Sequence, residues 1–94
     1  MSYTNKYNYD KFSNMEVKKA TISTMTIIDA VQTLPADEQI AGITAAFILL
    51  AERYGLEPQD CFVVIKNLMQ GADGRTPEFR AVQMYMEKEL SDGF

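Results

Sequence analysis

Few side chains in this 94-residue sequence are suited to catalysis, because it contains no histidine and a single cysteine. Without histidine there is no Ser-His-Asp or Cys-His pair, no imidazole base near neutral pH and no imidazole metal ligand. Cys61 stands near the start of a predicted helix, where the helix dipole could lower the pKa of the thiol. Its neighbours Glu57 and Asp60 are acidic and act in the opposite direction. We therefore interpret Cys61 as an unreactive, partly buried apolar residue.

Carboxylate pairs are the remaining candidates for acid or base catalysis. The pairs that lie close together in the sequence are Asp37 and Glu38, Glu52 and Glu57, and Glu87 and Glu89. Each lies beside a predicted helix end or on a polar helix face, where we expect solvated charge. The loop of residues 71 to 76 has one carboxylate, which is too few for a calcium-binding loop, and it lacks the Gly-Lys ending of a phosphate-binding loop. The sequence thus predicts no catalytic residue, no metal ligand and no cofactor.

The net charge of −4 is unevenly distributed along the chain. Residues 1 to 34 carry four lysines and three acids, whereas residues 35 to 94 carry five basic and ten acidic residues. A helix-turn-helix around the short turn at residues 55 to 57 would present Lys66 as the one cation of its second helix. Binding to a phosphate backbone needs several cations. We therefore do not expect nucleic acid to bind through this helix.

Aromatic residues are concentrated at the N-terminus. Tyr3, Tyr7, Tyr9 and Phe12 are interleaved there with Lys6 and Lys11. Residues 1 to 12 show no helical periodicity, so we predict a flexible arm in front of a bundle domain over residues 13 to 94. Four possibilities for the arm stay open: contact with a protein, stacking on single-stranded bases, packing on its own bundle, or remaining mobile. Its four aromatic residues are among the predicted partner-binding residues.

Helix periodicity and end signals predict an all-α fold, a small bundle of four helices joined by short connections. Ser13 and Glu16 have capping-box spacing, so the first helix is expected over residues 14 to 34. The β-branched residues at 21 to 24 favour a distortion or a break in this helix. Ile27, Ile28, Val31 and Leu34 lie on one face of its second half.

Prolines and glycines mark the ends of the other predicted helices. One helix is expected over residues 35 to 54 before Gly55, and one over residues 58 to 70 before Gly71. A last helix is expected from Pro77 to about Leu90, capped by Thr76. Its inward-facing residues are predicted to be Phe79, Val82, Met86 and Leu90.

The helix predicted over residues 35 to 54 is apolar on two faces. We expect its main stripe, Ile40, Ile43, Phe47, Leu50 and Tyr54, to face the core. Ala45, Ile48 and Leu49 lie outside this stripe. Two interpretations of this second face stay open: the bundle covers it, or it is exposed and closes a homodimer or docks a different protein. In the second interpretation these three residues bind the partner.

Three segments, LPADEQIAGITAAFILLAERYG, VVIKNLMQ and PEFRAVQMYMEKEL, make up most of the region between residues 34 and 90. In these segments the chain resembles small helical accessory proteins encoded by tailed bacteriophages. The resemblance implies action inside an infected bacterial cell, by binding and modulating a host or phage protein. A structural component of the virion is an alternative.

The expected location is the cytoplasm. The longest stretch without charge or strong polarity, residues 40 to 51, is shorter than the roughly 20 residues of a membrane-spanning helix. The N-terminus lacks the apolar run of a secretory signal, and a lone cysteine suits a reducing compartment. We therefore expect a non-enzymatic protein-interaction module with an unidentified protein partner or a second copy of itself. The alternative is a nucleic-acid-associated regulator that binds through the Tyr/Lys arm.

Overall fold

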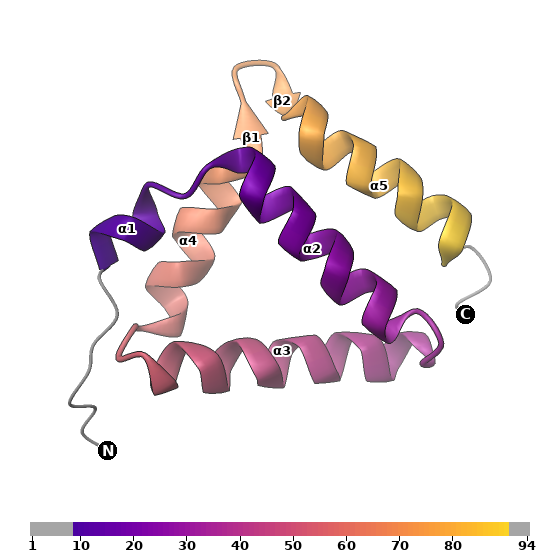
Figure 1. The fold of residues 1–94 in the computed structure, drawn as a ribbon, viewed down its shortest axis with the longest axis horizontal. Helices are drawn as coiled ribbons and strands as arrows, with labels where there is room; N and C mark the ends of the chain where they lie inside the picture. The colour runs from indigo at the N-terminus through magenta and orange to yellow at the C-terminus, as the bar shows by residue number, and fades with distance from the viewer. Residues whose placement is uncertain (1–8, 91–94) are drawn as a thin grey trace.

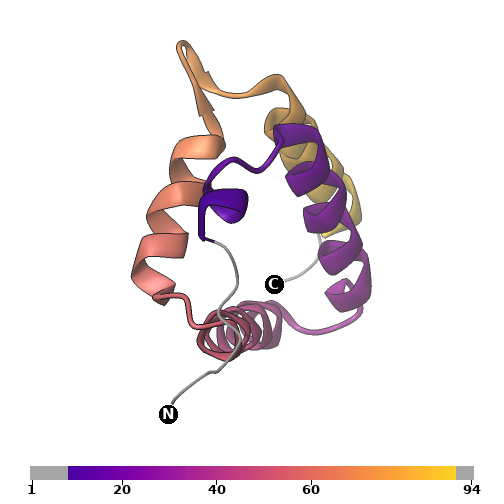
Figure 2. The same cartoon turned by 60° about the vertical axis from the view of Figure 1, so that its left-hand side comes forward.

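The computed structural model describes residues 9–90 as five helices and one short hairpin (Figure 1). In chain order the elements are α1 (Tyr9–Ser13), α2 (Val17–Val31), α3 (Ala36–Arg53), α4 (Pro58–Leu68), β1 (Gln70–Gly71), β2 (Gly74–Arg75) and α5 (Pro77–Glu89). The prediction of a mainly helical protein is confirmed. A four-helix bundle is not confirmed, because α2 packs against α5 while α3 packs against α4. Helices α2, α3 and α4 outline a triangle, and α5 lies along α2 in both views (Figures 1 and 2).

The N-terminal helix boundary differs from the prediction. Residues 9–13 form α1, and α2 begins at Val17 instead of residue 14. The Ser13 hydroxyl donates a hydrogen bond to the carbonyl oxygen of Asp10 at 3.1 Å, at the end of α1. Glu16 is the N-cap of α2 and makes no side-chain capping bond. The capping-box prediction is therefore wrong, because Ser13 is the last residue of α1 and the N-cap position of α2 lies three residues further on, at Glu16.

Helix α2 is continuous through its β-branched segment, so the expected distortion near residues 21 to 24 is absent from it. The hydroxyl groups of Thr21 and Thr24 donate to the carbonyl oxygens of Val17 and Ala20, each at 2.8 Å. These bonds satisfy the hydroxyls within the helix and remove their competition with the backbone ladder. The polar β-branched residues are thereby accommodated in a regular helix.

Helices α3 and α4 lie close to their predicted positions, and the turn between them follows the expected glycine. Gly55 has φ 72°, the left-handed conformation that glycine adopts without a steric penalty. The N–H of Gly55 donates to the carbonyl oxygen of Glu52 at 3.1 Å, and the N–H of Leu56 donates to that of Ala51 at 2.8 Å. This pair of bonds ends α3 in a Schellman motif.

The predicted loop of residues 71 to 76 is instead part of a small hairpin. Strands β1 and β2 pair antiparallel, with Gln70 opposite Arg75 and Gly71 opposite Gly74. Directly after β2, the Thr76 side chain accepts a hydrogen bond from the N–H of Phe79 at 3.3 Å. The predicted cap of α5 is therefore confirmed.

The core of the protein is small and lies mainly between α2 and α5. Ile28, Phe79 and Val82 form its buried cluster, and partly buried residues that include Met69, Tyr85 and Leu90 pack around it. Across residues 9–90, the buried side chains are those of Ile28, Ala36, Ala51, Cys61, Phe79 and Val82. Within that same range, the helices are too short or too polar to span a bilayer. Large parts of α3 and α4 contribute apolar side chains that the described residues 9–90 leave exposed.

Candidate protein-interaction surface

Helix α3 exposes the apolar stripe that the sequence assigns to the core. Ile40 is 64% exposed and Leu50 is 57% exposed, while Phe47 is half-buried. The expectation that this stripe faces the core is wrong for Ile40 and Leu50. The reason is the pairing of the helices, since α2 packs on α5 and leaves α4 as the main neighbour of α3.

The second apolar face of α3 is exposed as well. We call the four residues Ala41, Ala45, Ile48 and Leu49 the outer face of α3. At 100° per residue these positions lie within one arc of the helix surface. Leu49 is 65% exposed, and the other three are also exposed. The structure thus leaves the outer face uncovered, and Ala45, Ile48 and Leu49 are available for contact.

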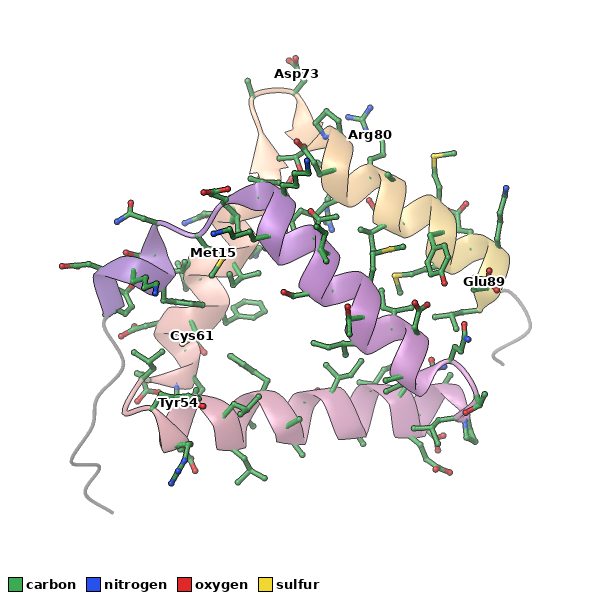
Figure 3. The ribbon with its side chains drawn as sticks, viewed as in Figure 1. Met15, Tyr54, Cys61, Asp73, Arg80 and Glu89 are labelled. Atoms are coloured by element: carbon green, nitrogen blue, oxygen red, sulfur yellow. The ribbon has the colours of Figure 1, made fainter. Side chains whose placement is uncertain are left out.

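A cavity of about 690 Å³ lies on another side of α3 and opens to solvent. Its lining residues are Phe12, Ile27, Val31, Gly42, Ile43, Ala46, Phe47, Leu50, Ala51, Tyr54, Leu56 and Cys61. Among these only Tyr54 and Cys61 have polar side-chain atoms. Figure 3 shows Tyr54 at the C-terminal end of α3 and Cys61 on the neighbouring α4. We call this apolar cavity the α3 groove.

Helix α1 brings two of the predicted partner-binding aromatics to the α3 groove. Phe12 lines the groove, and the exposed ring of Tyr9 lies 6.3 Å from the Phe12 ring at a tilt of 52°. Tyr3 and Tyr7 lie outside the described residues. The structure therefore places Phe12 in the groove wall, away from the outer face that holds Leu49, so the predicted residues do not form one continuous site.

Sequence reasoning missed the groove as a site. Ile27 and Val31 of α2 and Ile43 and Leu50 of α3 all line it, and periodicity places each of them on the face of a helix that should be buried. Periodicity identifies an apolar face but contains no information on which element covers it. No sequence signal could therefore have distinguished an open groove from a closed core.

The chemistry available at this surface is limited. Cys61 is buried, and burial raises the pKa of its thiol, with a further increase from the nearby carboxylates of Asp60 and Glu57. This environment favours the protonated form of the thiol. In the part of the chain that the structure describes, no cluster of three or more acidic or thiol side chains could hold a metal ion.

No protein-family model matches this chain, and comparisons with curated proteins and with solved structures give no match. The outer face and the groove therefore have to be interpreted from their own composition. Both offer mainly apolar contact area, with Tyr54 and Cys61 as the polar side chains of the groove lining. Burial of apolar surface is the main interaction that such an arrangement supports.

Proposed function

We propose that this chain is a non-enzymatic protein-interaction module that docks a partner protein on α3. The observation that carries the proposal is the exposure of Leu49, at 65%, on a helix that has no charged residue between Gln39 and Ala51. Contiguous exposed apolar surface of this kind marks interaction sites in soluble proteins. Covering it would contribute roughly 25 cal/mol for each Å² removed from water.

Docking on α3 implies a simple mechanism. The module would cover a surface of its partner, or bridge two partners through the outer face and the groove. Apolar contact with few hydrogen-bonding groups favours recognition by shape and burial, with the polar residues at the ends of α3 as the rim. The module would therefore modulate its partner without changing any covalent bond.

Affinity capture from a bacterial lysate with matched variants tests this function. Leu49→Asp places a charge on the outer face, while Met84→Asp places the same charge on α5 at a methionine that is 61% exposed. We expect the wild-type chain and Met84→Asp to retain the same bound protein and Leu49→Asp to lose it. Circular dichroism must show that both variants are folded. Equal capture by all three proteins would overturn the proposal.

Four further predictions from the sequence stay predictions. These are the resemblance to phage accessory proteins, a cytoplasmic location, incorporation into a virion and nucleic-acid binding through the Tyr/Lys arm. For the last of these, deletion of residues 1 to 12 should abolish binding that weakens steeply with salt.

A further inference from the structure

Two carboxylates mark the ends of the outer face of α3. Glu38 and Glu52 are fourteen positions apart, which corresponds to about 21 Å along a helix. At 100° per residue, each lies within about 20° of Ala45, the centre of the face. Both residues are exposed, and no cation stands three or four positions from either of them in the sequence. Arg53, next to Glu52, lies about 80° from Ala45 and therefore to one side of the face. The outer face is thus an apolar strip with a negative charge at each end.

This charge pattern disfavours a second copy of the chain as the occupant. A symmetric antiparallel pairing of two outer faces about Ala45 sets Glu38 opposite the Glu52 of the other copy, and does so twice. A parallel pairing sets each of the two carboxylates opposite its own equivalent. Both arrangements bring like charges together at the two ends of the interface, and like-charge contacts suppress association.

The same pattern is complementary to a helix with cations at its ends. We propose that the outer face of α3 docks an amphipathic helix of another protein, with a central apolar strip and a Lys or Arg at each end about four turns apart. The proposal rests on the proposed function and specifies its partner. The small side chains of Ala41 and Ala45 allow close approach of another helix, and Leu49 supplies the largest apolar contact of the face. The cations would then pair with Glu38 and Glu52.

A variant of this chain can serve as the test partner, because it can present an apolar strip with a cation at each end. The double variant Glu38→Lys/Glu52→Lys presents the same apolar strip with a cation at each end. We expect the wild-type chain and the variant each to be monomeric and an equimolar mixture to form a one-to-one complex, measured by sedimentation velocity. Each exposed ion pair contributes roughly two- to five-fold in affinity, so about 0.5 M salt should weaken the complex roughly ten-fold.

Matched variants separate this recognition from a general charge effect. Glu87→Lys/Glu89→Lys changes the net charge by the same amount on α5, and it should not associate with the wild-type chain. Leu49→Asp in the wild-type partner should abolish the complex. Glu52→Lys alone introduces its cation at a helix C-terminus, where the dipole tolerates it, and it should form a homodimer. This single variant keeps the test informative if the double variant does not fold.

Three outcomes would overturn the inference. The first is that neither the equimolar mixture nor Glu52→Lys alone associates. The second is that Glu87→Lys/Glu89→Lys associates with the wild-type chain as strongly as Glu38→Lys/Glu52→Lys does, and the third is a wild-type homodimer that Leu49→Asp dissociates. The last outcome would identify a second copy as the occupant, and the proposed function would stand. Failure of the proposed function is a different result, since it requires lysate capture that Leu49→Asp leaves unchanged.

Discussion

Tyr85 on α5 donates a hydrogen bond from its phenolic hydroxyl to Oδ1 of Asp29 on α2. This bond crosses the interface that contains Ile28, Phe79 and Val82. The hydrogen bond is the main cause that raises the pKa of Tyr85 to about 12, and burial and the negative charges of Asp29 and Glu89 raise it further. The bond therefore links the two helices in a way that depends on the protonation of the phenol.

We expect the contribution of Tyr85 to stability to be lost at high pH. The folded pKa of about 12 exceeds the ordinary value of 10, so the folded chain holds this proton more tightly than the unfolded chain. The contribution is complete below pH 10 and declines as the pH rises toward about 12. The free energy of unfolding of Tyr85→Phe should fall below that of the wild-type chain at pH 8, and the two should converge as the pH approaches 12.

Ultraviolet titration of the tyrosines provides an independent measurement of the same bond. Tyr85→Phe should remove a step near pH 12 from the tyrosine titration of the chain. Asp29→Asn should move that step downward, because the amide no longer holds a negative charge next to the phenolate. Unchanged titration curves in both variants would contradict the role of the bond.

Removal of one methyl group from isoleucine should distinguish the core from the exposed stripe of α3. Ile28 is 5% exposed and Ile40 is 64% exposed. Ile28→Val should lower the free energy of unfolding by about 0.5–1.5 kcal/mol, because it leaves a small cavity against Phe79 and Val82. Ile40→Val should change it by less than about 0.5 kcal/mol. Urea denaturation measures both values, and equal costs would show that Ile40 is covered in solution.

Two glycine substitutions should have opposite effects on stability. A Cβ at Gly42 would meet no atom within 4 Å, so Gly42→Ala should raise the free energy of unfolding by up to about 1 kcal/mol through helix propensity. Gly55 has φ 72°, so Gly55→Ala should lower it by about 1–2 kcal/mol. Thermal and urea unfolding measure these changes. A destabilising Gly42→Ala would indicate that another surface packs against this position.

The Cys61 thiol should react slowly in the folded chain. It is buried, and its raised pKa reduces the thiolate fraction at pH 8. A disulfide reagent at pH 8 should label it at least roughly ten-fold more slowly than in the urea-unfolded chain, because labelling requires a local opening. The ratio of the two rates is the quantity to measure. Equal rates would show that α4 does not protect this side chain.

The sequence predicted those elements whose ends depend on local chemistry. Pro58 begins α4, Thr76 caps α5, and Gly55 ends α3 in the conformation expected for it. The same local reasoning was wrong at Ser13, because α2 begins at Val17 with Glu16 as its N-cap, and Ser13 ends the preceding helix α1.

The candidate site was predictable only in part. The amphipathic pattern identified Ala45, Ile48 and Leu49 as a face separate from the main stripe, and the structure exposes all three. The pattern also assigned Ile40 and Leu50 to the core, where the structure does not place them. A helical period shows which side chains share a helix face, but it gives no information on which other helix packs against that face.

By itself, the sequence determined the helices, their approximate ends, the absence of imidazole chemistry and the apolar character of α3, because all of these depend on residues close together in the chain. Only the tertiary structure decided that α2 pairs with α5, that α3 pairs with α4, and that both apolar faces of α3 stay largely exposed. The physical reason is that burial of apolar surface is non-directional. Several pairings of the same amphipathic helices would bury apolar surface. The choice among these pairings depends on the packing of Ile28, Phe79 and Val82, which come from segments distant in the chain.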